Sequence, residues 1–238
     1  MDETSISDKT SGKLVYDILK RSIPLKDSDF AAMIPLAEGD GPFAVLVAVI
    51  LSQNTNDKNA IRAYKELKQR IGLDPYKLAR TSMDKIVDAI RIAGLAEQKA
   101  YAIKKASEVI IDLGGSIALL VVDPEVLENK LLSIKGIGKK TVDVTLSVLG
   151  RKKVFAVDTH AFRVARRWGI ARGGYERTSK ALSEFFSDVP LDEAHRLVIA
   201  LGRLYCKARN PRCRECPLGK ICPYPEQSQQ VSLKERHG

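Results

Sequence analysis

A run of nine apolar residues, Phe43 to Leu51, restricts the fold more than any other feature of the chain. It follows the turn-forming pair Gly41-Pro42 and contains no polar side chain. A membrane-spanning helix needs about 20 apolar residues, so this run is too short to cross a bilayer. It suits instead a helix that is buried on all sides in a protein core. The run therefore predicts a buried helix within a globular protein.

Helical spacing of apolar residues extends over nearly the whole chain. Apolar side chains recur every three or four residues in further segments, which predicts amphipathic helices. These segments are residues 13–21, 57–71, 83–92, 98–113 and 190–206. Residues 153–157 have the composition of a strand but no second strand to pair with, so we expect an extended linker there. The predicted fold class is all-α.

The chain carries a formal net charge of +10, from 39 Lys+Arg against 29 Asp+Glu. A basic balance of this size suggests a polyanionic partner such as a nucleic acid. Residues 1–10 are polar and mixed in charge, unlike a signal peptide, so we expect an intracellular protein. Residues 1–10 and 225–238 are also expected to be disordered tails.

All four cysteines, Cys206, Cys213, Cys216 and Cys222, lie within 17 residues near the end of the chain. A disulfide framework in a chain of this length would normally spread its cysteines. Clustering points instead to one metal or iron–sulfur site. Four cysteinyl sulfurs can bind either zinc or a [4Fe–4S] cluster, and ligand chemistry alone does not separate the two. Zinc sites usually show two C-x2-C pairs, however, whereas this chain has one.

A hairpin of two helices joined by glycines is predicted in the middle of the chain. Asp123-Pro124-Glu125 begins the first helix, because it combines an N-cap, a proline at the first helical position and an acid in the first turn. Gly136-Ile137-Gly138 forms the turn, and residues 139–149 form the second helix. Glycines let the backbone approach a ligand closely, and the N–H groups that open the next helix can hold a phosphate. Gly-x-Gly alone is also compatible with an ordinary turn between packed helices.

Two lysines, Lys139 and Lys140, open the second helix of this hairpin. A helix N-terminus disfavours cations, so the helix dipole does not stabilise these lysines, but a bound phosphate would offset the cost. The same field, with neighbouring positive charge, would lower a lysine pKa. Because only a neutral amine attacks carbon, a lysine here is a candidate nucleophile. The alternative is an ordinary solvated surface lysine.

Asp158 lies 18 residues beyond Lys140, in the segment Val157-Asp158-Thr159-His160. It follows an apolar run and precedes a predicted helix that extends to Trp168. An aspartate at that position predicts a helix N-cap. An N-cap aspartate can also have a catalytic role, so the two interpretations are compatible.

Together these segments resemble the helix-hairpin-helix DNA glycosylase superfamily. The resemblance rests first on Ile137-Gly138-Lys139-Lys140-Thr141 and on V-D-T-H-A-F-R-V at residues 157–164. The cysteine spacing C-x6-C-x2-C-x5-C is similar to that of the [4Fe–4S] loop of endonuclease III and its adenine-excising relatives. I-L-S-Q-N-T-N-D at residues 50–57 and Gly94-Leu95 resemble the early segment and the wedge loop of the family. The resemblance extends from residue 14 to residue 224.

The resemblance implies two helical subdomains with a DNA-binding cleft between them. The first would be a six-helix barrel over residues 34–145 that includes the helix-hairpin-helix at 127–149. The second would combine residues 11–33 and 146–224 and carry the [4Fe–4S] loop at 206–222. On this interpretation the cluster is structural. The cations near its ligands would contact phosphates or offset the negative charge of the cluster; they are Lys207, Arg209, Arg212, Arg214 and Lys220.

The same resemblance assigns roles to individual residues. Lys140 would be the nucleophile at the sugar C1′ carbon, and Asp158 would be the essential carboxylate. Gln53 would fill the space left by an extruded base, and Leu95 would press against the orphaned partner base. The remaining assignments are hairpin contacts to DNA from Gly136, Gly138, Lys139 and Thr141, and cluster ligands at Cys206, Cys213, Cys216 and Cys222.

The function implied by the resemblance is removal of a damaged base, by family default an oxidised pyrimidine, followed by strand cleavage. The enzyme would be a bifunctional DNA glycosylase and AP lyase that acts as a monomer on double-stranded DNA. Lys140 favours this activity, since the adenine-excising relatives and some mismatch-specific thymine glycosylases lack the hairpin lysine. Two alternatives stay open: a monofunctional glycosylase for mismatched thymine or uracil, and a non-catalytic DNA-binding protein. Asn54-Thr55-Asn56, where familiar bacterial members differ, leaves the damage spectrum open.

Overall fold

The computed structural model describes residues 5–225, and every regular element in this part of the chain is helical, as the sequence predicts. The chain divides into two compact units. The central unit is Lys26–Lys152, and the terminal unit combines the described residues of Met1–Leu25 and Lys153–Gly238. Within residues 5–225, each helix is too short or too polar to cross a membrane.

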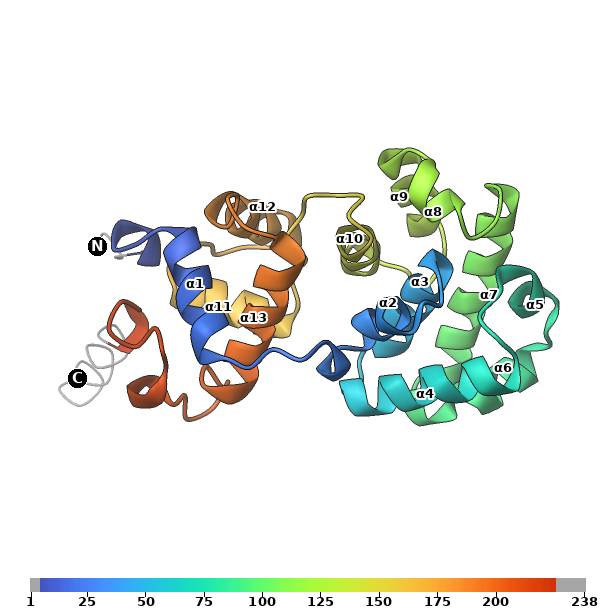
Figure 1. Cartoon of the computed structure of the whole chain (residues 1–238), viewed down its shortest axis with the longest axis horizontal. Coiled ribbons are helices and arrows are strands. Elements are labelled where there is room, and N and C mark those ends of the chain that lie inside the picture. Colours follow the sequence, from blue (N-terminus) through green and yellow to red (C-terminus); the bar gives the residue numbers. More distant parts are fainter. Residues whose placement is uncertain (1–4, 226–238) are drawn as a thin grey trace, which may run out of the picture. The chain divides into compact units, whose positions relative to one another are not determined.

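Figure 1 labels the helices of both units. The central unit contains α2 (Ile34–Glu38), α3 (Pro42–Ser52), α4 (Asp57–Arg70), α5 (Pro75–Arg80), α6 (Met83–Ile90), α7 (Ala96–Asp112), α8 (Ala118–Val121), α9 (Pro124–Leu132) and α10 (Lys139–Val148). Its short 3₁₀ helices are η2 (Asp27–Asp29), η3 (Ala31–Met33) and η4 (Arg91–Ala93). The terminal unit contains η1 (Ile6–Asp8), α1 (Gly12–Ser22), α11 (Thr159–Arg167), α12 (Tyr175–Phe185), α13 (Leu191–Leu204) and η5 (Cys213–Glu215).

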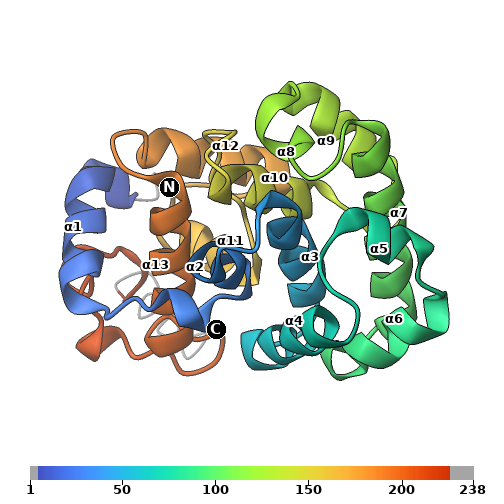
Figure 2. The same ribbon diagram turned by 45° about the vertical axis from the view of Figure 1, so that its right-hand side comes forward.

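The predicted buried helix is confirmed as α3, in the core of the central unit. Residues 43–51 are each at most 3% exposed. Helices α2, α4, α7 and α10 pack around α3 (Figure 2). Gly41 precedes the helix with a φ of 85°, a conformation that favours glycine, and Pro42 occupies the first helical position. Each large apolar side chain buried here contributes about 1.5–3 kcal/mol, so α3 anchors the unit.

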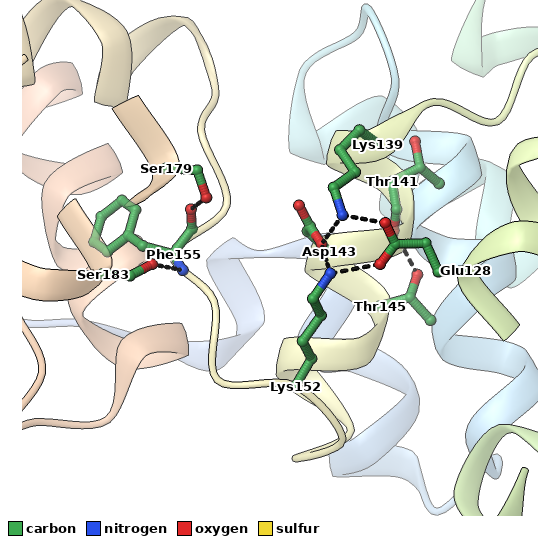
Figure 3. Close-up of polar contacts among 9 residues, drawn as sticks. All are labelled: Glu128, Lys139, Thr141, Asp143, Thr145, Lys152, Phe155, Ser179 and Ser183. Carbon is green, nitrogen blue, oxygen red and sulfur yellow. Dashed lines mark hydrogen bonds and ion pairs between the residues drawn. The ribbon is translucent and has the colours of Figure 1, made fainter. Parts of the chain in front are cut away.

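The terminal unit has an aromatic core that includes the predicted linker. Phe155 is fully buried and stacks on Phe186, with 5.6 Å between the ring centroids. Its segment, residues 153–157, is extended and pairs with no strand among the described residues, which confirms the prediction. Two hydroxyls of α12 satisfy its backbone instead. Ser183 accepts the N–H of Phe155 at 2.8 Å, and Ser179 donates to the Phe155 carbonyl at 2.8 Å (Figure 3).

The predicted disorder of residues 1–10 is wrong for residues 5–10. Ser5 caps η1, and Ile6 is fully buried. The N–H of Ile6 donates to the carbonyl of Trp168 at 2.7 Å, which fixes this segment to the terminal unit. A single buried isoleucine makes no periodic pattern, so the sequence carried no signal for it. The rest of the predicted tails, residues 1–4 and 226–238, lies outside the described residues.

The boundary between the units also differs from the predicted one. Residues 26–33 and 146–152 belong to the central unit, whereas the sequence assigned them to the other subdomain. The N–H of Ala31 donates to the side chain of Asp57 at 3.0 Å, which ties the first segment to α4. The second segment includes the end of α10, where Leu149 packs against the central core.

Candidate active site

Of the two glycines in the hairpin between α9 and α10, the backbone conformation requires one, Gly136. Gly136 has a φ of 96°, which L side chains rarely adopt. Gly138 is the N-cap of α10, and a Cβ atom added there would meet no heavy atom within 4 Å. Within the described part of the chain, no hydrogen bond uses the backbone N–H groups of Gly138, Lys139 or Lys140. Such N–H groups at a helix N-terminus form a ready site for a phosphate.

Gln53 is joined to this hairpin by its side chain. It is the first residue after α3, and its Nε2 donates to the Gly136 carbonyl at 3.0 Å and to Oγ1 of Thr141 at 2.9 Å. The structure therefore brings together three of the residues predicted to contact DNA. The next residue, Asn54, has a φ of 50°, so the chain turns sharply there.

A network of four charged side chains holds α9, α10 and the end of the central unit together (Figure 3). Lys139 and Lys152 each form ion pairs with both Glu128 and Asp143. The side chain of Asp143 is fully buried, and its carboxylate lies 3.0 Å from the Lys152 ammonium and 3.4 Å from the Lys139 ammonium. The sequence interpretation singled out only Lys139 of this network. The position of Asp143, four residues further along the same helix face, was the one local signal for it.

Burial and pairing act in opposite directions on this network. Burial alone would raise the pKa of Glu128, but hydrogen bonds from Lys139 and Lys152 outweigh it and hold that pKa below its ordinary value. Burial alone would lower the pKa of Lys152, but hydrogen bonds to Glu128 and Asp143 raise it. Any phosphate that binds Lys139 must therefore compete with two carboxylates.

Lys140, the next residue, has the opposite environment. Its side chain is exposed and makes no hydrogen bond or ion pair with any described residue. Successive residues of an α-helix lie about 100° apart around the axis, so one lysine can be paired while its neighbour faces solvent. The hairpin thus presents one uncommitted amine beside the uncommitted N–H groups.

Leu95 combines an exposed apolar side chain with an unusual backbone. It is 49% exposed and has a φ of 51° and a ψ of 38°, in the left-handed region. That conformation costs a residue other than glycine about 1–2 kcal/mol. Gly94 before it has a φ of 69° and a ψ of 159°, so two residues with positive φ turn the chain into α7. Neither the exposure nor the strain stabilises the fold, which makes Leu95 a candidate for contact with a ligand.

Asp158 is the N-cap of α11, as its position in the sequence predicts. Its carboxylate accepts the backbone N–H of Ala161 at 2.7 Å. The residue is half-buried and belongs to the terminal unit, whereas the hairpin belongs to the central unit. The cap fixes the orientation of the carboxylate and leaves a catalytic role compatible with it.

The four cysteines line one pocket of the terminal unit, together with Arg167 and Tyr224. Burial raises the pKa of Cys216 to about 11 and that of Cys222 to about 12. Burial also raises the pKa of Cys213, and the neighbouring thiol of Cys206 adds to this effect. Over residues 5–225, no group of three or more His, Cys, Asp or Glu side chains is arranged to hold a single metal ion.

Two arginines of α11, which the sequence interpretation did not single out, hold the start of the cysteine loop. Arg167 donates to Sγ of Cys206 at 3.2 Å and to the carbonyl of Lys207 at 2.7 Å. Its guanidinium also lies 4.4 Å from the centre of the Tyr224 ring. Arg163 donates to the carbonyl of Cys206 at 2.8 Å. These contacts join residues about 40 positions apart in the sequence, so no local sequence pattern predicts them.

Comparison with known proteins identifies the family. Residues 47–188 match the HhH-GPD superfamily of base excision DNA repair proteins. Endonuclease III of Sulfolobus acidocaldarius is 36% identical over 213 residues, which are 88% of this chain and 94% of the relative. Endonuclease III of Thermotoga maritima is 33% identical over 185 residues, which are 77% of this chain and 83% of the relative.

A similar solved structure supports the same family. A trapped endonuclease III–DNA covalent intermediate has a TM-score of 0.69 and 27% identity to this chain, and the match covers 92% of this chain and 99% of the other. The superfamily match spans more than half of the chain, and the relatives align over most of their own length. The chain therefore belongs to the HhH-GPD superfamily of base excision DNA repair proteins and, within it, to the endonuclease III family of DNA glycosylases.

Proposed function

We propose that the protein excises an oxidised pyrimidine from double-stranded DNA and then cuts the strand on the 3′ side of the damaged nucleotide. Membership of the endonuclease III family makes the chain a base excision repair enzyme, a DNA glycosylase with AP lyase activity. The observation that carries the residue assignment is the environment of Lys140. It is an exposed amine with no partner among the described residues, beside N–H groups that also lack one.

The hairpin is assigned to the DNA backbone. A phosphate would accept hydrogen bonds from the N–H groups of Gly138, Lys139 and Lys140. These contacts come from backbone N–H groups, so they position the protein without reading the base sequence. Because Gln53 is hydrogen-bonded to Gly136 and Thr141, a phosphate held by the hairpin would also fix Gln53 relative to the DNA.

Base excision requires the damaged nucleotide to leave the duplex. Extrusion costs a few kcal/mol, and less for a damaged or mismatched base, which gives the enzyme some selectivity. Gln53 would occupy the vacated space, and Leu95 would press against the base left opposite. An apolar wedge of this kind offsets part of the cost of unstacking. The exposed side chain of Leu95 suits that role.

Strand cleavage follows from an amine at the sugar carbon. Neutral Lys140 would attack C1′ while the bond between C1′ and the base breaks, and the departing base takes up a proton. Loss of a proton from the new C–N linkage and opening of the sugar ring leave a Schiff base. The Schiff base acidifies C2′, and removal of a C2′ proton expels the 3′ phosphate by β-elimination. Hydrolysis then releases the lysine.

Asp158 is assigned the carboxylate role in this chemistry. An ionised carboxylate can accept a proton from the lysine ammonium, or stabilise positive charge on the sugar as the base departs. Its hydrogen bond from the Ala161 N–H keeps the side chain in one orientation. Preorganisation of this kind avoids reorienting the charge during the reaction.

We also assign a [4Fe–4S] cluster to the pocket that the four cysteines line. Two observations support this: the C-x6-C-x2-C-x5-C spacing, and the donation from Arg167 to Sγ of Cys206, since cluster-bound sulfurs accept hydrogen bonds. The cluster would supply a rigid centre for the loop, and no step of the reaction is assigned to it. A brown protein with visible absorption would support the assignment, whereas a colourless protein with stoichiometric zinc would contradict it.

A duplex oligonucleotide with one oxidised pyrimidine tests the activity. Cleavage without alkali, with capture of a covalent complex by borohydride, would support the bifunctional enzyme. Cleavage only after alkali would indicate a monofunctional glycosylase, and intact DNA under both conditions a non-catalytic DNA-binding protein. The same assay with uracil, and with thymine opposite guanine, tests the assigned lesion.

A further inference from the structure

Lys99, on α7, is a buried lysine with an unusual set of partners. It is 2% exposed, and its ammonium donates to the Leu51 carbonyl at 2.9 Å and to the Ala93 carbonyl at 2.8 Å. Within residues 5–225 it meets no carboxylate. Burial lowers the pKa of Lys99 to about 8, and even the neutral amine keeps two N–H groups, one for each carbonyl. The amine head is therefore committed to these two backbone groups.

The carbonyls of Leu51 and Ala93 belong to the backbone segments that carry Gln53 and Leu95, the two side chains that we assign to the interior of the duplex. Leu51 is in the last turn of α3, two residues before Gln53. Ala93 ends η4, two residues before Leu95. One ammonium therefore joins two segments of backbone that are about 40 residues apart in the sequence.

A fixed separation between these segments matters for recognition of a lesion. Gln53 and Leu95 would enter the same damaged step, one in place of the extruded base and the other against its partner. A displacement of about 1 Å at a reacting site can cost roughly a hundredfold in rate. Leu95 also has a strained backbone, and such strain persists only where the surrounding contacts hold it. The bond from Lys99 to the Ala93 carbonyl is one of those contacts.

We propose that Lys99 is a positioning residue for lesion recognition, whose ammonium holds the Gln53 and Leu95 segments at a fixed separation so that both side chains enter the duplex together. The inference rests on the proposed function, because it takes these two side chains to be the ones that meet the extruded nucleotide. Lys99 is buried and acts through them, with no contact to DNA of its own.

Lys104, five residues further along α7, provides a matched control. Its ammonium also donates to two backbone carbonyls, those of Ala79 and Thr81 at the end of α5. No residue of that segment is assigned to DNA. The two lysines therefore share their helix and their kind of partner. Lys104 is half-buried where Lys99 is buried, and only the segments that Lys99 holds carry side chains assigned to DNA.

The test compares Lys99→Met with Lys104→Met in the full-length protein with its metal centre. The probes are a duplex with one tetrahydrofuran abasic analogue and the same duplex undamaged, and the readout is the ratio of the two Kd values. We expect Lys99→Met to lower the preference for the abasic duplex by about tenfold or more, and Lys104→Met by less than about twofold. Circular dichroism and thermal unfolding establish that both variants are folded. Equal ratios in the two variants would overturn the proposal.

A double-mutant cycle separates positioning from a general loosening of the fold. In a Gln53→Ala/Leu95→Ala background, Lys99→Met should lower the preference no further, because its effect passes through these side chains. An undiminished loss in that background would contradict the proposal. If Lys99→Met does not fold, Lys99→Gln replaces it in both comparisons. Its shorter amide can reach one carbonyl at most, so the loss should keep its direction.

Failure of this inference and failure of the proposed function give different results. If the wild-type protein binds abasic and undamaged duplexes equally, this result contradicts the proposed function and therefore also the role of Lys99. A wild-type protein with a clear preference, retained in full by Lys99→Met, would remove only the inference.

Discussion

The hairpin and the cysteine loop are both surrounded by cations, but the two regions use them differently. At the hairpin, Lys140 and the N–H groups beside it have no partner within the described residues. At the cysteine loop, Arg167 donates to Cys206, and Arg212 forms an ion pair with Glu215. The hairpin therefore has unpaired groups that can bind a ligand, whereas some of the cations at the loop are paired with groups of the loop itself.

This difference teaches that a basic sequence does not reveal which cations are available to DNA. Lys139 and Lys140 are identical neighbours in the sequence, yet one is paired with two carboxylates and the other faces solvent. The net charge of +10 attracts a polyanion at long range, but contact depends on the cations that have no internal partner.

The largest effect is expected at Lys140, where the hairpin differs most from the loop. Lys140→Ala should lower strand cleavage at an abasic site at least about a thousandfold and abolish borohydride capture, because the nucleophile is gone. Lys135→Ala, which removes an exposed lysine in the same hairpin, is the control and should be captured normally at saturating protein. Capture of Lys140→Ala at the wild-type level would remove this lysine from the mechanism.

Asp158→Asn removes the charge of the capping residue but keeps a side chain that can cap α11. Asparagine caps a helix about as well as aspartate, so thermal unfolding should change little. Base excision should fall about a hundredfold, since a neutral amide neither accepts the proton nor stabilises the sugar cation. Single-turnover excision and binding to the abasic duplex measure the two effects separately. If excision is unchanged, the role of Asp158 is limited to capping α11.

Glu128→Gln tests the network of ion pairs between Glu128, Lys139, Asp143 and Lys152. Removing this carboxylate leaves Lys139 and Lys152 with Asp143 alone, and should destabilise the protein by about 2 kcal/mol at neutral pH. The pKa of Glu128 is lowered in the folded state, so its stabilisation is complete above the ordinary value of 4.5 and is lost as pH falls through the lowered one. Urea unfolding at pH 7 and below pH 4 measures this, and a difference from wild type that does not shrink in acid would contradict the pairing.

The smallest effect is expected in the cysteine loop. Arg209 is exposed with no partner within the described residues, whereas Arg212 is paired with Glu215. Arg209→Gln should therefore reduce the salt dependence of DNA binding by about one phosphate contact, and Arg212→Gln by less. The slope of log Kd against log salt for the abasic duplex measures both. Equal slopes for the two variants and wild type would mean that the loop does not contact the DNA backbone.

Features with a local pattern were predictable. The apolar run predicts α3, and its full burial confirms the prediction. The predicted helix at residues 98–113 is found at Ala96–Asp112, and Asp158 caps α11 as expected. In each case the backbone and side chains that form the element lie within a few residues of one another, so short-range spacing is enough to identify it.

Helix α12, in contrast, was not predicted. Tyr175, Leu182 and Phe185 pack against the core, but the buried Thr178 and Ser179 lie between them, so polar residues interrupt the apolar stripe that marks an amphipathic helix. Ser179 is buried because its hydroxyl donates to the carbonyl of Phe155, which comes from another segment. That reason for burial exists only after the chain has folded.

The same distinction, between local pattern and tertiary contact, applies to the individual charged residues. Spacing within the chain predicted the hairpin and the capping aspartate, because helix propensity and capping act between near neighbours. Folding settled which lysine is paired, which is exposed and which is buried, since Lys139 meets a carboxylate from α9 and Lys99 meets carbonyls from two other segments. A lysine has the same side chain in all these places, and its partner depends on how the helices pack.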